Sequence, residues 1–309
     1  MSKYSIVVPA YNEEATLRLF YQAAVPVFET LNEEFEMIFV NDGSTDKTGE
    51  ILTELARQDK RVKVCRFSRN FGQQAALLCG LEQATGDAVI AMDADLQDSP
   101  CAALEMVKKW KEGYEIVHGK RKSRKGESAF KKRTADMFYK LASKITGLDI
   151  PQNVGDFKLY DRKVVNAILS MPEHDRLLRA QTAWVGFKQT FVEFDRTERV
   201  AGKSHYTLKK MVKLAQSGIL PNTEAGLMFP IKTGLLLGVA SVACFITFIV
   251  LACLGIEFGG LTAWLFPTIG LVGSLTLVCQ GRANLHTAMI YREVQNRPKY
   301  IVAEKLNLE

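Results

Sequence analysis

Two long stretches without any charged residue constrain this chain more than any other feature. Residues 233–256 read TGLLLGVASVACFITFIVLACLGI, and residues 261–281 read LTAWLFPTIGLVGSLTLVCQG. A helix needs about 20 apolar residues to cross a bilayer, and both stretches reach that length. A buried hairpin of core helices is the alternative. Because neither stretch is N-terminal, neither fits a signal peptide. We expect a large extramembrane domain followed by a hairpin of two transmembrane helices.

The basic residues around these stretches predict an orientation. They are absent from the short link near Glu257 and flank the outer ends, at Lys209, Lys210, Lys213, Lys232, Arg282, Arg292, Arg297 and Lys299. Lys and Arg are retained on the cytoplasmic side of a membrane. We therefore expect a multi-pass protein of the cytoplasmic (inner) membrane with both termini in the cytoplasm.

Net charge and cysteine usage narrow the class of protein. The formal charge of +6 is compatible with nucleic acid, but an anionic membrane surface or a phosphorylated ligand explains it more simply beside two spans. The six cysteines stand singly, without a C-x-x-C pair or a histidine at metal-site spacing. This spacing argues against zinc and against a disulfide framework, and it fits a reducing compartment.

Strand and helix patterns alternate through the N-terminal part of the chain. Strands are predicted over residues 4–11, 36–43, 63–68 and 88–95, with helices ending near residue 29, spanning about 44–56, and spanning 73–84. Several strands are apolar almost throughout, as parallel strands covered on both faces are. The alternation predicts a doubly wound α/β sheet. Neither G-x-G-x-x-G after the first strand nor G-x-x-x-x-G-K-[ST] occurs, which disfavours ordinary dinucleotide and P-loop binding.

Polar side chains follow all four predicted strands, at the edge of the sheet where α/β proteins bind ligands. They are Tyr11, Asn12 and Glu13, then Asn41 and Asp42, then Arg69 and Asn70, and finally the aspartates of AMDADLQDSP (91–100). Asp98 precedes Ser99 and Pro100, which are typical of a helix start, so it is interpreted as a residue that favours the helix dipole. Asp93 and Asp95 would share one face of a continuing strand and suit Mg²⁺ or Mn²⁺. Solvated residues leaving a strand are the alternative.

Several motifs resemble one family in order and spacing. VVPAYNEE, VNDGSTD, RNFGQQAAL and DADLQD are similar to the catalytic domain of inverting glycosyltransferases of the GT-A fold, family 2 type. NVGDFKLYDR, ERVAGKSHY and IYREVQNRPKYIV resemble the polyprenyl-phosphate glycosyltransferases within it, a group that includes bactoprenol-phosphate glucosyltransferases and dolichol-phosphate mannose synthase. The resemblance covers almost the whole chain, and the C-terminal hairpin favours the bactoprenol branch.

The resemblance assigns roles to residues at matching positions. It implies a nucleotide site at Pro9, Tyr11, Glu13, Asp42 and Asp93, a divalent cation (Mg²⁺ or Mn²⁺) at Asp93, Asp95 and Gln97, and an acceptor-phosphate site at Arg121, Arg133, Arg199 and Ser204. It places Asp156 beside the reacting centre as the general base. A phosphomonoester acceptor, however, has a second pKa of about 6 and is largely ionised at neutral pH. Positioning or electrostatic stabilisation by Asp156 stays an equal alternative, and an ordinary turn residue after Gly155 is a third.

Two basic segments suggest contact with lipid. Residues 120–144 are rich in Lys and Arg, and they could form a solvated face or meet headgroups and the acceptor phosphate. Residues 206–220 predict a basic amphipathic helix that either lies in the membrane interface or packs on the catalytic domain. The expected division is therefore a GT-A catalytic domain (1–200), amphipathic interfacial helices (201–230), two transmembrane helices (231–282) and a cytoplasmic tail (283–309).

The expected activity is inverting transfer of one sugar, glucose before N-acetylglucosamine, galactose or a modified pentose, from a UDP-sugar to undecaprenyl phosphate. Membrane lipid is an expected partner, nucleic acid is not, and self-association is a further expectation. A processive polysaccharide synthase is disfavoured because Gln181–Trp184 lacks the Q-x-x-R-W pattern. A non-catalytic scaffold that binds nucleotide-sugar is the rival from another class. His205-Tyr206 and Ala288-Met289 depart from the family pattern and leave acceptor contacts and hairpin packing open.

Overall fold

The computed structural model describes residues 2–121, 154–173, 177–194 and 293–308, with scattered positions between 246 and 291. The chain divides into two compact units. One comprises Met1–Gly218 together with Pro298–Glu309, and the other comprises Ile219–Arg297. The first unit contains every strand and helix named below, so the C-terminal residues belong with the N-terminal sheet.

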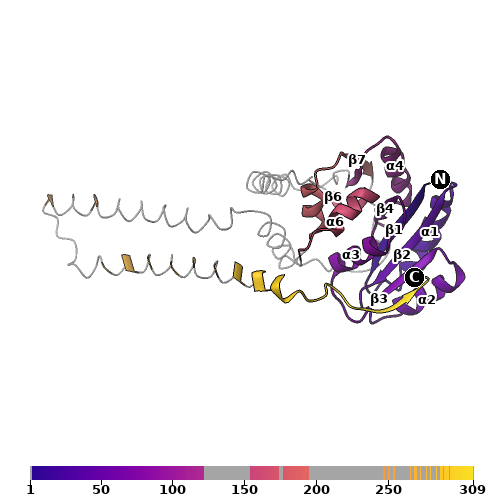
Figure 1. Ribbon diagram of the computed structural model, residues 1–309, viewed down its shortest axis with the longest axis horizontal. Helices are drawn as coiled ribbons and strands as arrows, with labels where there is room; N and C mark the ends of the chain where they lie inside the picture. The colour runs from indigo at the N-terminus through magenta and orange to yellow at the C-terminus, as the bar shows by residue number, and fades with distance from the viewer. Residues whose placement is uncertain are drawn as a thin grey trace. The chain divides into compact units, whose positions relative to one another are not determined.

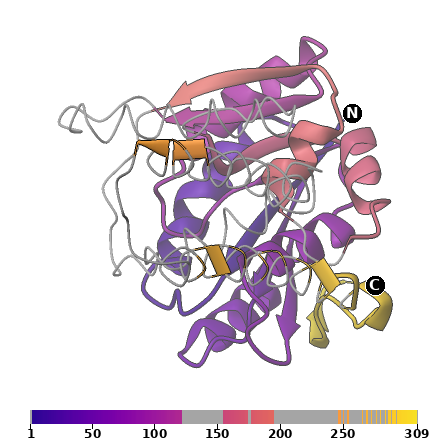
Figure 2. The ribbon, with the colours of Figure 1, turned by 90° about the vertical axis from the view of Figure 1, so that its left-hand side faces the viewer.

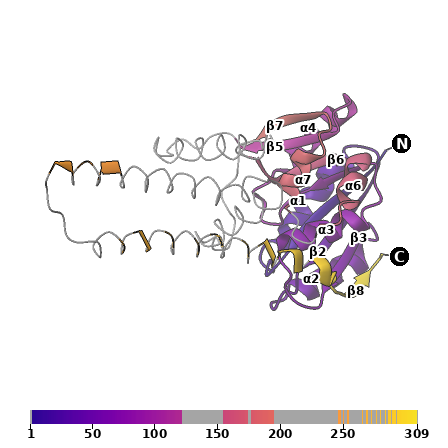
Figure 3. The same ribbon diagram turned by 60° about the vertical axis from the view of Figure 1, so that its left-hand side comes forward.

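In the described part of the chain, eight strands form one sheet in the order β7-β5-β6-β4-β1-β2-β3-β8. Parallel pairing joins β1 (Lys3–Ala10), β2 (Glu34–Asn41), β3 (Val62–Phe67) and β4 (Ala88–Ala91). Beyond β4, β6 (Val154–Asp161) runs antiparallel to both β4 and β5 (Ile116–Arg121). β7 (Gln189–Phe194) lies parallel to β5, and Figure 3 shows these two strands side by side. The predicted α/β fold is confirmed, with a mixed sheet.

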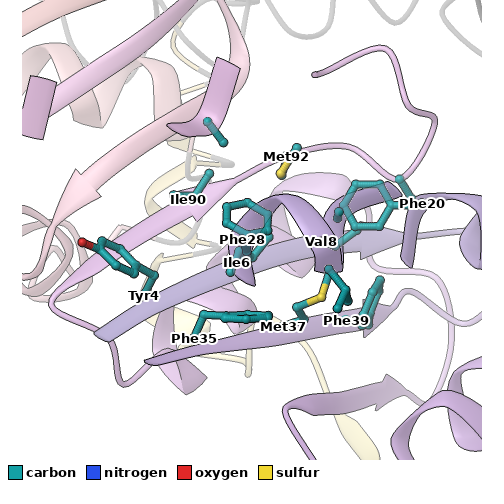
Figure 4. Packing of buried hydrophobic residues seen from close by; sticks show 14 of the residues in the cluster. Tyr4, Ile6, Val8, Phe20, Phe28, Phe35, Met37, Phe39, Ile90 and Met92 are labelled. Carbon is teal, nitrogen blue, oxygen red and sulfur yellow. The ribbon is translucent and has the colours of Figure 1, made fainter. Parts of the chain in front are cut away.

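Helices cover both faces of the sheet (Figure 1). On one face lie α1 (Leu17–Glu29), α2 (Thr48–Gln58) and α4 (Pro100–Lys111), and on the other lie α3 (Gln73–Gln83), α6 (Arg162–Leu169) and α7 (Leu178–Trp184). Successive residues of a strand point to opposite faces. Ile6 and Val8 therefore pack against Phe20 and Phe28 of α1 (Figure 4), whereas Val7 belongs to the core beneath α3.

The predicted boundaries hold for the first three strands and fail for the fourth. Strands expected over 4–11, 36–43 and 63–68 agree with β1, β2 and β3 to within two residues. The strand expected over 88–95 ends at Ala91. The chain turns there because Leu96 adopts a left-handed φ of 59° and the Asp95 carboxylate accepts a hydrogen bond from the Gln97 N–H at 3.1 Å. The prediction that Asp93 and Asp95 share a strand face is therefore wrong.

The end of the chain forms a strand that the sequence did not predict. Within the expected tail, β8 (Val302–Leu306) pairs antiparallel with β3 and closes that edge of the sheet, where Figure 2 shows the yellow C-terminal segment beside the violet N-terminal elements. Tyr300 stacks on Phe67 with ring centroids 4.8 Å apart, and Glu304 pairs with Arg66 at 2.9 Å. The β3 edge of the sheet is thus covered by residues more than 230 positions away along the chain.

The expected membrane elements lie almost entirely outside the described residues. The structure does not describe residues 122–153, which include nearly all of the basic stretch. It also does not describe residues 195–245, which include the amphipathic segment. The two apolar stretches are described only at isolated positions. Within the described residues, no helix combines the length and apolar character needed to span a bilayer.

A buried carboxylate ties the amino ends of the central strands together. Glu36 of β2 accepts hydrogen bonds from the Ser5 hydroxyl at 2.6 Å and the Thr85 N–H at 2.7 Å, and it forms an ion pair with Lys63 at 2.7 Å. Burial alone would raise its pKa, but the bonds from Lys63, Ser5 and Thr85 outweigh burial and lower the pKa to about 2.

Glu36→Gln is expected to destabilise the full-length chain by about 3 kcal/mol at pH 7, since each unit of pKa shift corresponds to about 1.36 kcal/mol. The pKa is lower in the folded state, so this stabilisation is complete above the unfolded value of 4.5 and is lost as the pH falls towards 2. Urea unfolding as a function of pH measures this contribution to the free energy of unfolding. Glu34→Gln, at an exposed position of the same strand, is the control; equal effects of the two variants would contradict the prediction.

Asn307→Ala is expected to weaken the attachment of β8. The Asn307 side-chain amide donates to the carbonyls of Ala56 at 2.7 Å and Val62 at 2.8 Å, and lost bonds of this kind cost about 1–2 kcal/mol together. Asn296→Ala is a matched control because Asn296 also has a left-handed φ, 45° against 55°, and is exposed. Thermal unfolding compares the stability of the two variants. A loss of stability in Asn307→Ala no larger than that in Asn296→Ala would refute the role of these bonds.

Candidate active site

The candidate site lies where the strand order reverses. β1 is followed along the chain by β2 on one side of it, and β4 lies on the other side. Ligands of open α/β sheets bind outside the carboxyl ends of the strands at such a point. Because β6 runs antiparallel to β4 with Ala91 opposite Lys158, Asp156 of β6 lies next to the residues that follow β4. One strand pair thus brings Asp93 and Asp156 together.

The motifs that follow β1 and β2 form one interlocked surface. The Asn12 side chain accepts the Thr45 N–H at 2.9 Å, and the Ser44 hydroxyl accepts the Asn12 N–H at 3.0 Å. The Glu13 N–H donates to Thr48 at 2.8 Å. Next to this surface, Tyr11 has 43% of its area exposed, so its ring is available to a ligand.

The Asp42 carboxylate is hydrogen-bonded within the protein and is not exposed to solvent. Its buried carboxylate accepts bonds from the Phe71 N–H at 2.7 Å, the Gly72 N–H at 2.9 Å and the Asn70 amide at 3.0 Å. Burial raises its pKa despite the two backbone bonds. Asp42 therefore fixes the loop that precedes α3. The nucleotide contact expected from the resemblance would have to use a carboxylate that already accepts these three hydrogen bonds.

The three expected cation ligands lie in the turn after β4. Asp95 and Gln97 are buried, and the Asp93 carboxylate accepts a bond from the Gln73 amide at 2.9 Å. Asp98 precedes α4 as predicted, but its carboxylate also accepts the Asp93 N–H at 3.2 Å and is only 1% exposed. Asp98 therefore shapes this turn as well as preceding the helix.

The charges around Asp93 fit a divalent cation. Burial raises the pKa of Asp93 well above its ordinary value, and the charges of Asp98, Asp156 and Asp95 raise it further. A bound cation would offset this crowding of carboxylates. Within the described residues, no three His, Cys, Asp or Glu side chains form a closed metal site. Mg²⁺ does not require one, because it is commonly held by one or two carboxylates together with substrate phosphates.

Asp156 is held by a fork of two bonds from Arg179, a residue that the sequence did not single out. Arg179 Nε lies 2.8 Å from Asp156 Oδ1, and its Nη2 lies 3.2 Å from Oδ2. Burial alone would raise the pKa of Asp156, but the charge and bonds of Arg179, with the charges of Lys158 and Arg121, hold it below its usual range. Asp156 is thus an ionised, oriented carboxylate, which excludes the reading as a solvated turn residue.

Further cationic groups surround this carboxylate. Lys158 is buried, and burial lowers its pKa to about 8 while the nearby Asp156 opposes that shift. Arg121 ends β5, and a Cβ added at Gly155 would lie 3.0 Å from its guanidinium. Arg121 therefore lies near Asp156, and its assignment to the acceptor phosphate stays a prediction. Arg133, Arg199 and Ser204 lie outside the described residues, so their assignment to the acceptor stays a prediction.

Sequence reasoning missed four residues of this site, and the signal available differs between them. Gln73 and Gln74 lie inside the motif RNFGQQAAL, which by itself indicates no role for either side-chain amide. Lys158 followed Asp156 at a spacing of two on a strand, a signal that places both on one face. Arg179 had no local signal, because only the packing of α7 brings it to Asp156.

Comparison with known proteins shows the family to which the chain belongs. The chain is 43% identical to an uncharacterized glycosyltransferase of Bacillus subtilis, YkcC, over 99% of this chain and 95% of that protein. It is 38% identical to a prophage bactoprenol glucosyl transferase homolog of Escherichia coli, over 97% of this chain and 98% of the relative. A bactoprenol glucosyl transferase of Shigella phage SfX is 37% identical over 98% and 99%, respectively. The family model named Glycosyl transferase family 2 matches residues 5–169, and the chain belongs to that family.

Proposed function

We propose that this protein transfers one glucose unit from UDP-glucose to undecaprenyl phosphate, with inversion at the anomeric carbon. The observation that carries the proposal is that an ionised Asp156 and the carboxylates of Asp93 and Asp95 converge at one edge of the sheet. Support for the substrates comes from relatives named bactoprenol glucosyl transferase, which are similar over nearly the full chain.

The reaction forms a bond from an acceptor phosphate oxygen to the anomeric carbon and breaks the bond from that carbon to UDP. Asp93, Asp95 and Gln97 would hold Mg²⁺ or Mn²⁺, which when bound neutralises charge on the departing diphosphate as a Lewis acid. Arg121 and Lys158 supply positive charge on the Asp156 side of the site, where a dianionic phosphate would approach.

Asp156 has an electrostatic rather than a basic role in this proposal. Its pKa lies below the usual range, so it is a weaker base than an ordinary aspartate. The acceptor monoester, with a second pKa of about 6, does not require a base at neutral pH. A fixed negative charge beside the sugar instead stabilises the positive charge that develops on the ring as UDP leaves.

The location of the protein is part of the proposal. We infer an inner-membrane protein with both termini in the cytoplasm, since the uncharged stretches are long enough to span a bilayer and basic residues flank their outer ends. The lipid acceptor would then be reached at the cytoplasmic membrane face. Self-association through the hairpin stays a prediction.

The purified full-length chain, with labelled UDP-glucose, undecaprenyl phosphate and Mg²⁺ or Mn²⁺, is expected to give a single lipid-linked glucose. Chelation by EDTA is expected to abolish turnover. Thin-layer chromatography identifies the product. A ladder of longer products would indicate a polysaccharide synthase, faster transfer from another UDP-sugar would reassign the donor, and UDP binding without any turnover would indicate a scaffold.

Asp156→Asn is expected to lower kcat on the order of 10²–10³-fold with little change in KM for UDP-glucose, because it removes a charge that acts in the transition state. In the wild type, activity is expected to fall below about pH 6 as the acceptor phosphate is protonated. Steady-state kinetics across pH measures both effects. Retained activity of Asp156→Asn with UDP bound would eliminate a role for this charge.

A further inference from the structure

Helix α7 begins without a capping side chain of its own. The residue before it, Leu177, has an extended backbone conformation and carries no side-chain acceptor. The first N–H groups of a helix have no partner within the helix and require one elsewhere. Here the Leu178 N–H donates to the side-chain carbonyl oxygen of Gln74 at 3.1 Å. Gln74 lies in the first turn of α3, so one helix supplies the cap of another.

This cap fixes which way the Gln74 amide faces. With Oε1 bound to α7, the Nε2 group of Gln74 faces Asp156 and lies 3.5 Å from Oδ2. A separation of 3.5 Å gives a weak hydrogen bond. The stronger contact of Gln74 is therefore with the start of α7, and any effect on Asp156 passes mainly through that helix.

The residue that follows the capped N–H is Arg179, which forms the fork on Asp156. The middle of α7 is attached to the same strand as Asp156, because the hydroxyls of Thr182 and Tyr160 lie 3.2 Å apart. Polar contacts thus attach α7 at two places, to α3 at its start and to β6 in its middle, while Leu178 packs in the core. Loss of the first would remove the polar anchor next to Arg179 and let the start of α7 shift.

We propose that Gln74 is a positioning residue that acts through Arg179 to hold the Asp156 carboxylate towards the reacting centre. The inference rests on the proposed function, for which Asp156 is the group beside the sugar. Displacements of about 1 Å at a reacting centre can cost on the order of 10²-fold in rate, so a remote cap can be kinetically important.

A double-mutant cycle on the full-length chain tests this. Gln74→Met, which keeps the length but removes the acceptor, is expected to lower kcat on the order of 10-fold with KM for UDP-glucose nearly unchanged. Arg179→Met is expected to lower kcat on the order of 10²-fold, and Arg179→Lys to recover part of the loss. If Gln74 acts through Arg179, the double variant falls no further than Arg179→Met.

Gln83→Met is the matched control, because Gln83 ends the same helix and its side chain accepts only a surface bond from Lys305 at 2.9 Å among the described contacts. UDP titration in each variant counts folded sites, which separates slower turnover from partial unfolding. Hydrogen exchange at the start of α7 supplies a readout that does not depend on activity. It is expected to quicken in Gln74→Met and stay unchanged in Gln83→Met.

Independent, additive losses at Gln74 and Arg179, or a Gln74→Met variant that matches Gln83→Met in kcat and in exchange, would overturn the inference. Failure of the proposed function looks different. The wild type would then transfer no glucose to undecaprenyl phosphate, while the exchange experiment would still report whether Gln74 caps α7.

Discussion

The structure at the candidate site depends on how buried negative charge is balanced. Asp93, Asp95, Asp98 and Asp156 meet where β4 ends and β6 begins, and unpaired carboxylates in such a place are costly. The fold compensates the charges of these carboxylates to different extents. Asp156 receives the paired bonds of Arg179 and stays ionised, whereas the pKa of Asp93 is raised by its neighbours. The two sides are therefore electrostatically different before any ligand arrives.

This asymmetry matches the two tasks of a sugar transfer. The side with excess negative charge suits a divalent cation and a diphosphate, because a cation there relieves repulsion that the fold has left in place. The other side presents a fixed carboxylate with Lys158 and Arg121 close by. Both sides are linked by the first turn of α3, where Gln73 contacts Asp93 and Gln74 contacts α7 and Asp156. The start of α3 thus connects the two sides of the candidate site.

The strands and helices of the N-terminal half were largely predictable, because apolar runs and strand-end polar residues are local signals. The expected sites at Asp93, Asp95, Asp156 and Arg121 also came together at one edge of the sheet. Local signals failed where a long-range contact decides the outcome. The predicted fourth strand stops at Ala91, and the expected tail contributes β8, since its backbone pairs with β3 and its Tyr300 stacks on Phe67. Neither event leaves a distinctive pattern in its own stretch of sequence.

By itself, the sequence determined the α/β class, the residues that carry acidic chemistry and the family resemblance, because these depend on residue type, order and spacing. Only the tertiary structure decided which charges those residues meet. Arg179 reaches Asp156 from a helix 23 positions along the chain, and Gln74 caps that helix from 104 positions away. The ionisation of Asp156 depends on the contact with Arg179, because the pKa of a buried carboxylate is set by its neighbours in space and not by those in sequence.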